Sequence, residues 1–214
     1  MSKQTNIPVL VVSLALIAGI AAALLGWVSD VTKVPIAAAL QENNNAALQQ
    51  VLPAFDNQPA NETNQVGNVT FYVARKNGEV VGFAGKTVSN KGYSGEVTVL
   101  AGVQLDGTIT TVIVTKQTET PGLGTVVCGR ARKKTISKLI KGIKEAGLPP
   151  NPILDQFRGM KAASGQAPWT VKKDGGDLDA KTGATITSRA VGGAVFTIAE
   201  CFAQNSTELL KENN

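Results

Sequence analysis

Histidine is absent from the 214-residue sequence, and cysteine is rare. The lack of histidine excludes Ser-His-Asp triads, histidine general acid–base catalysis and histidine-ligated metal sites. The two cysteines, Cys128 and Cys201, are too few and too far apart to form a four-cysteine zinc site or to hold an iron–sulfur cluster by themselves. The sequence leaves open whether they pair or stay as small buried hydrophobic residues.

Aromatic residues make up 5% of the chain and charged residues 17%, and the net charge is a modest +5. No zinc-finger spacing, RNP aromatic motif or basic tail accompanies this charge, so we expect no nucleic-acid partner. The hydrophobic fraction of 43% is that of an ordinary globular domain plus one apolar stretch. The composition therefore predicts one domain with its own core and one additional apolar segment.

That apolar segment is residues 7–28, which contain no charged side chain. As a helix it would be about 33 Å long, enough for the ~30 Å hydrocarbon layer of a membrane. The apolar core of a cleaved signal peptide is normally ~7–15 residues, so a retained single-pass anchor is the favoured interpretation. Lys3 before the segment, compared with Asp30 and Lys33 after it, favours a cytoplasmic amino terminus. The rest of the chain is then expected on the extracytoplasmic side of the cell membrane.

Beyond the anchor, which we assign to residues 1–30, the sequence indicates a membrane-proximal helix and a polar linker in residues 31–68. The helix is expected at 34–52, which is rich in alanine and glutamine, and the linker at 56–68. We assign residues 69–214 to the folded domain.

The first half of that domain predicts two β-hairpins. Strands at 69–75 and 79–88 are joined by Asn77-Gly78, and strands at 96–105 and 108–117 are joined by Asp106-Gly107. Asparagine-glycine and aspartate-glycine pairs are strong signals for hairpin turns. Two such hairpins predict a mainly antiparallel sheet.

The second half predicts mostly helix. The spacing of Ile136, Leu139, Ile140 and Ile143 is typical of an amphipathic helix, and another is expected from about Thr187 to Leu210. Seven basic residues lie between Arg130 and Lys144, which is compatible with a solvated helix face or with a docking surface for an acidic partner. Residues 168–173 could add a strand. The predicted class is α+β, with helices packed on an antiparallel sheet.

Residues 179–190, DAKTGATITSRA, form a small, hydroxyl-rich turn that leads directly into the predicted C-terminal helix. The first amides of a helix lack internal partners and the helix dipole is positive there, so such a turn suits a phosphate group. Gly183 and Ala184 allow close approach of the backbone, and Lys181 offers a countercharge. Hydroxyl groups are available on Thr182, Thr185, Thr187 and Ser188. A capped helix start that binds nothing has the same pattern, so the residues alone leave both interpretations open.

Residues 179–185, D-A-K-T-G-A-T, resemble the flavinylation signature D-x-x-S/T-G-A-T of bacterial FMN-binding domains. These domains occur in the G subunit of the Rnf electron-transport complex and in the C subunit of the sodium-pumping NADH:quinone oxidoreductase. In that family a flavin transferase moves FMN from FAD onto the last threonine and releases AMP. The resemblance implies covalent FMN on Thr185 through a phosphoester, with Thr182 at the Ser/Thr position and Asp179 serving recognition by the transferase.

Residues 118–124, TETPGLG, are similar to the E-T-P-G-L-G loop that packs against the flavin in the same family. Pro121 fixes one backbone dihedral, and the glycines on either side of Leu123 permit turns and close approach. Leu123 can press on an apolar ring, whereas Glu119 and Thr120 can bond to the polar edge of the ring or to the backbone. The loop residues expected at the flavin are Glu119, Thr120, Gly122 and Leu123.

The strand pair at 92–109 also resembles the family, so that the similarity covers about residues 1–205 in the right order. It implies an electron-transfer subunit of an ion-translocating complex of the Rnf type, which acts with the other subunits and is not catalytic alone. The C subunit of the quinone reductase is the near alternative. A membrane-anchored flavin-binding sensor without a pump, or a structural domain without flavin, would belong to other classes of protein.

Overall fold

The computed structural model describes residues 7–130 and 147–212. It divides into two compact units, with the boundary between Asn43 and Asn44. The basic helix predicted around Ile136 to Ile143 lies outside the described residues.

Helix α1, Ile7–Val51, begins in the first unit and ends in the second. Its side chains from Ile7 to Val28 are all exposed, including large apolar ones such as Leu16 and Trp27. Among the described residues, α1 and the C-terminal helix α5, Thr185–Glu212, are long and apolar enough to cross a membrane. Most of the apolar stretch of α5 is buried within the domain, as in the core helix of a soluble domain, whereas that of α1 is entirely exposed. The exposed apolar helix agrees with the predicted anchor.

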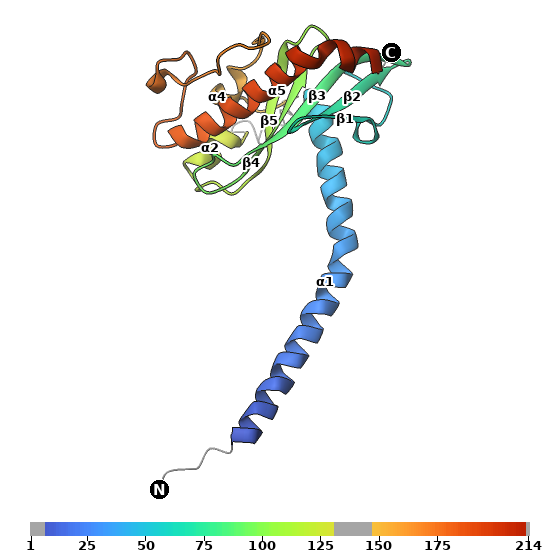
Figure 1. Ribbon diagram of the computed structural model, residues 1–214, viewed down its shortest axis with the longest axis vertical. Coiled ribbons are helices and arrows are strands. Elements are labelled where there is room, and N and C mark those ends of the chain that lie inside the picture. The colour runs from blue at the N-terminus through green and yellow to red at the C-terminus, as the bar shows by residue number, and fades with distance from the viewer. Residues whose placement is uncertain (1–6, 131–146, 213–214) are drawn as a thin grey trace, which may run out of the picture. The chain divides into compact units, whose positions relative to one another are not determined.

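The second unit is built on a five-stranded antiparallel sheet in which each strand pairs with its neighbour in the sequence (Figure 1). Asn77 and Gly78 both have positive φ, 53° and 85°, which is the conformation that the predicted asparagine-glycine turn requires. The two predicted hairpins and the antiparallel sheet are therefore confirmed. The strands are β1 (Thr63–Val66), β2 (Val69–Lys76), β3 (Glu79–Ser89), β4 (Val97–Val103) and β5 (Ile109–Gln117).

Both faces of the sheet are covered. Alternate residues of each strand point to opposite sides, so the strands contribute side chains to both cores. One face packs against α5 and forms the larger core, in which Phe202 contacts the rings of Phe71 and Phe83 at centroid distances of 6.0 and 5.4 Å. Figure 1 shows α5, drawn in red, lying along this face. The other face packs against the last turns of α1 through Leu48 and Val51. This second core explains why β4 is buried on both sides.

Close approach of α5 to the sheet depends on a glycine in β3. A Cβ built on Gly85 would overlap Cγ2 of Ile198 and would lie 3.1 Å from the Phe71 ring. Ile198 and Phe71 are fully buried. A glycine in a strand interior weakens the strand, but here it allows the helix to seat on the sheet.

Two segments differ from the expectations. Residues 56–68, expected as a polar linker, contain a short 3-10 helix, Pro59–Asn61, and strand β1, whose alternating exposure marks it as the edge of the sheet. The strand expected at 168–173 is wrong. Val171 makes only an isolated bridge with Leu178, and the chain then enters a 3-10 helix, Lys172–Asp174. Gly175 ends this helix in a left-handed conformation with φ of 85°.

We expect Gly85→Ala to destabilise the domain by about 1–3 kcal/mol, because the added methyl group overpacks the interface between β3 and α5. Thermal unfolding followed by circular dichroism measures the effect. Gly193→Ala in α5 is the matched control, since a Cβ there meets nothing within 4 Å. That variant should gain roughly 0.5–1 kcal/mol from helix propensity. Equal loss of stability in both variants would contradict close packing at Gly85.

Candidate functional site

The turn before α5 is organised by backbone bonds and by one serine. Ala184 N donates to Lys181 O at 2.9 Å, and Gly183 takes a positive φ of 82°. The Ser188 hydroxyl donates to Ala184 O at 3.0 Å and accepts from Lys181 N at 3.2 Å. These bonds lead the chain directly into the helix, whose first residue is Thr185.

The four hydroxyl groups of this segment fall into two classes. Those of Thr187 and Ser188 are buried and donate hydrogen bonds within the protein, Thr187 to Glu119 and Ser188 to Ala184. Those of Thr182 and Thr185 make no hydrogen bond to any part of the chain that the structure describes. Thr182 is exposed in the turn, whereas Thr185 is half-buried at the start of α5. Thr185 therefore offers an available hydroxyl beside the amide groups of a helix start.

The loop at 118–124 folds into a compact turn that leads into the short helix α2, Gly124–Cys128. The carbonyl oxygen of Thr120 accepts from Leu123 N at 3.2 Å and from Thr125 N at 3.3 Å. Gly122 has a positive φ of 79°, and its amide donates to the Thr125 hydroxyl at 2.9 Å. The turn leaves Leu123 exposed over 44% of its surface.

The two predicted loops meet in space although some sixty residues separate them in sequence. A Cβ built on Gly183 would lie 3.2 Å from Cδ2 of Leu123. The leucine of the first loop thus lies directly against the glycine of the second. Leu123, Val126 and Ile186 are all more than 40% exposed, so that apolar surface is available next to Thr185.

Glu119 joins the two loops through a buried carboxylate that is only 5% exposed. Its Oε2 accepts from the Thr187 hydroxyl at 2.9 Å, and its Oε1 accepts from Tyr93 N at 2.8 Å and, more weakly, from Ser94 N at 3.5 Å. Gly124 makes room for the carboxylate, since a Cβ there would lie 2.5 Å from Oε2. In this structure both oxygens of the carboxylate are bonded to the protein itself.

The turn between β3 and β4 is a third segment of this region, which the sequence patterns did not assign to it. The Ser94 hydroxyl lies 3.4 Å from that of Thr120, and the Thr118 hydroxyl donates to Ser94 O at 3.1 Å. Gly92 and Gly95 frame the turn, and a Cβ on Gly92 would lie 2.6 Å from Glu119 Oε1. The glycine pair on either side of Tyr93 and Ser94 was the available signal, because it marks a close approach of the backbone.

The charged side chains near the α5 start differ in their availability. Arg189 donates from Nε and Nη2 to the two carboxylate oxygens of Asp174, each at 2.6 Å, and this partner lowers the pKa of the Asp174 carboxyl. Lys181 is exposed and makes no ion pair with any described residue. Asp179 is exposed, and its Oδ1 accepts from Lys172 at 2.7 Å. Lys181 is therefore a cation left available beside the turn.

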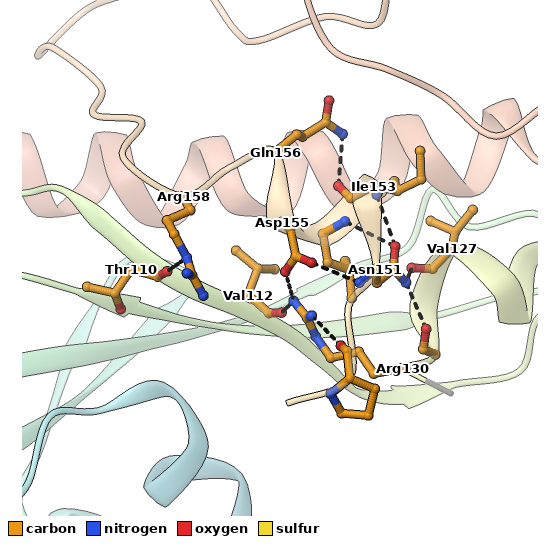
Figure 2. A network of polar contacts seen from close by, with 12 residues as sticks. Thr110, Val112, Val127, Arg130, Asn151, Ile153, Asp155, Gln156 and Arg158 are labelled. Atoms are coloured by element: carbon orange, nitrogen blue, oxygen red, sulfur yellow. Dashed lines mark hydrogen bonds and ion pairs between the residues drawn. The ribbon is translucent and has the colours of Figure 1, made fainter. Parts of the chain in front are cut away.

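Helix α2 is held in place by two buried side chains, which Figure 2 shows from close by. The Asn151 amide donates to the carbonyl groups of Val126, Val127 and Gly129 at 2.7–3.1 Å, which caps the end of α2. Arg130 donates to Pro149 O at 2.9 Å and to Val112 O at 3.0 Å, and it pairs with Asp155 at 2.7 Å. The end of α2 is thereby fastened to β5 and to the short helix α4, Pro152–Asp155.

The comparisons with known proteins agree with the geometry of the site. The family model described as FMN-binding domain matches residues 92–200, which include all three segments. The chain is 36% identical over 205 residues to the G subunit of the ion-translocating oxidoreductase complex of Cereibacter sphaeroides, and the match covers 92% of this chain and 84% of that relative.

Two further relatives carry related names. The chain is 32% identical to the G subunit of the Na(+)-translocating ferredoxin:NAD(+) oxidoreductase complex of Acetobacterium woodii, over 85% of this chain and 84% of the relative. It is also 32% identical to the G subunit of the ion-translocating oxidoreductase complex of Escherichia coli K12, over 86% and 85% of the two chains.

Both cysteines are free, and Cys128 provides a test of the burial next to Glu119. Burial and the Glu119 carboxylate raise the pKa of the Cys128 thiol to about 12. We expect iodoacetamide to alkylate Cys128 in folded Cys201→Ala protein at pH 8.5 at least about 100-fold more slowly than in the unfolded chain, where the pKa is ~8.5. Mass spectrometry of timed samples measures the rates.

The raised pKa of the Cys128 thiol makes the free energy of unfolding depend on pH. Because the folded pKa is raised, the contribution of the Cys128 thiol is fully present below the unfolded pKa and is lost as pH rises from ~8.5 towards 12. Equal alkylation rates in folded and unfolded protein would contradict a buried thiol.

Proposed function

Since the chain belongs to the FMN-binding domain family and to the G subunits of ion-translocating oxidoreductase complexes, we propose that it is the electron-transfer subunit of an Rnf-type complex. In this proposal FMN is attached to Thr185 through a phosphoester. The chain supplies no catalytic group of its own to the overall reaction, which requires the other subunits of the complex.

The observation that carries the proposal is the available hydroxyl of Thr185 at the start of α5. Thr187 and Ser188, the other hydroxyls on this turn of the helix, already donate to protein acceptors. Thr185 occupies the last position of the D-A-K-T-G-A-T segment and follows the left-handed Gly183 by two residues. A phosphate on Thr185 Oγ1 would be next to the first amide groups of the helix, where negative charge is favoured.

The residues around Thr185 fit the remaining parts of FMN. Because Gly183 has no side chain and Ala184 only a methyl group, their backbone can approach the phosphate closely. Lys181 is an exposed countercharge. The exposed side chain of Leu123 offers an apolar surface to the ring, and Thr120 and Gly122 belong to the turn that presents it. FMN, when bound, supplies the capacity to accept and donate electrons, and the polarity and charge of this surface tune that capacity.

A covalent link suits the proposed location of the domain. With a cytoplasmic amino terminus, α1 would anchor the chain as a single-pass protein, and the flavin would lie on the extracytoplasmic side of the membrane. A carrier there cannot be refilled from FMN in the cytosol, so attachment prevents its loss. The exposed position of Asp179, next to the turn but held by Lys172, leaves its carboxylate accessible to a flavin transferase.

We expect Thr185→Ala to abolish attachment of FMN, because it removes the hydroxyl oxygen through which the proposed phosphoester forms. The full chain is produced together with a flavin transferase, and the measurements are intact mass and ultraviolet fluorescence of the denatured band. The wild type should carry the added mass of one FMN and the variant none.

Thr182→Ala is the matched control, since it removes the other available hydroxyl of the same turn. It should retain most of the attached FMN. Loss of fluorescence in both variants would mean that Thr182 also has a chemical role or that the turn collapsed, and a fluorescent Thr185→Ala band would refute attachment at Thr185.

We expect protease added to intact spheroplasts to degrade the domain, because the proposal places everything after residue 30 outside the cytoplasm. Immunoblotting of the C-terminal end follows the digestion, and a cytoplasmic protein in the same cells is the control. A domain that is protected until the membrane is permeabilised would reverse the proposed orientation.

A further inference from the structure

The structure assigns Glu119 and Thr187 a positioning role, in which the buried Glu119 carboxylate holds the three segments of the flavin site together. The inference rests on the function proposed above, since it concerns the site of the same cofactor. It refines the sequence expectation, in which both residues are candidates for binding the flavin and Glu119 bonds to the ring edge or to the backbone.

The contacts of Glu119 leave it little capacity for a ligand. The carboxylate is 5% exposed, and each oxygen already accepts a bond, one from the β3–β4 turn and one from α5. Thr187 is 1% exposed and uses its hydroxyl as the donor to Oε2. A hydrogen bond to a carboxylate is roughly twice as strong as a neutral one, so these contacts are strong enough to fix the backbone of the segments they join.

The Glu119 carboxylate contacts the segments whose displacement would affect the flavin most. Its own backbone leads into the turn that carries Leu123, its Tyr93 partner belongs to the β3–β4 turn, and Thr187 is two residues from Thr185. The glycines at 92 and 124 are packed against its two oxygens, so the surrounding backbone is shaped for a carboxylate at this position. Thr118 also donates to Ser94 O, which ties the β3–β4 turn to the 118–124 loop, but among the described residues it is Glu119 that connects all three segments.

The relation between Leu123 and Thr185 follows from this anchor. Leu123 reaches Gly183 only if the 118–124 loop and the α5 start keep their present separation. Among the described residues, the bond between Glu119 and Thr187 is the hydrogen bond that joins these two segments, so it helps to fix their separation. Glu119 therefore acts on the flavin through Leu123 and Thr185, the two residues proposed to contact the flavin. It is a positioning residue.

The first measurement is hydrogen exchange in the full chain without flavin. We expect Glu119→Ala to speed the exchange of the Tyr93 and Ser94 amides by about 10- to 100-fold, because a bond to a charged acceptor is lost. Glu119→Gln keeps a carbonyl acceptor for Tyr93 and an amide that can pair with Thr187, so it should restore most of the protection. Protection that is unchanged in Glu119→Ala would overturn the inference.

The second measurement is the state of the flavin in chains produced with a flavin transferase. We expect Glu119→Ala and Thr187→Val to lower the rate of FMN attachment by about 10-fold or more, since misplacement by ~1 Å can cost 10²-fold. The visible circular dichroism of FMN that does attach should change, because the ring then meets a displaced Leu123.

Thr87→Val is the matched control. Thr87 is also a buried threonine, 3% exposed, whose hydroxyl donates one bond, to Asn68 O at 3.0 Å, but this bond joins β3 to the β1–β2 turn and to none of the three segments. It should lose similar thermal stability and leave attachment and the flavin dichroism as in the wild type. If Thr87→Val and Thr187→Val behave alike, the positioning role is refuted, whereas a wild type that carries no FMN refutes the proposed function instead.

Discussion

The close packing of α5 on the antiparallel sheet is the constraint on which the rest of the domain depends. Phe202 and Ile198 of this helix fill the larger core, and Gly85 lets the helix approach because it has no side chain. The same helix begins at Thr185, so the packing that stabilises the domain also positions the proposed attachment residue. A site at the first turn of a core helix is rigid because the helix behind it cannot move without opening the core.

The loops in front of α5 are held by polar contacts. The Glu119 carboxylate connects the 118–124 loop to Thr187 and to the β3–β4 turn, and Asn151 caps α2 from the other side. Buried carboxylates are costly unless they accept bonds, and this one accepts from the backbone and from a hydroxyl. Apolar packing therefore sets the position of the helix, whereas a few buried polar bonds set the loops that complete the site.

Much of the fold and part of the candidate site could be predicted. The hairpin turn at Asn77-Gly78, the turn at Asp106-Gly107 and the apolar face of α5 are local signals that tertiary contacts reinforce, and all appear in the structure. The strand expected at 168–173 was wrong because the chain enters a 3-10 helix directly after Val171. The edge strand β1 was missed because its polar residues have no apolar alternation.

The sequence by itself determined the α+β class, the apolar N-terminal helix and the two motifs that mark the chain as a member of its family, since each depends on residues close together along the chain. Only the tertiary structure decided which hydroxyls of the α5 start are available and which are already bonded. It also brought Leu123 against Gly183 and revealed the β3–β4 turn as a third segment. The physical reason is that the partner of Thr187 is 68 residues away, and a hydrogen bond over that separation exists only once the sheet and α5 have packed.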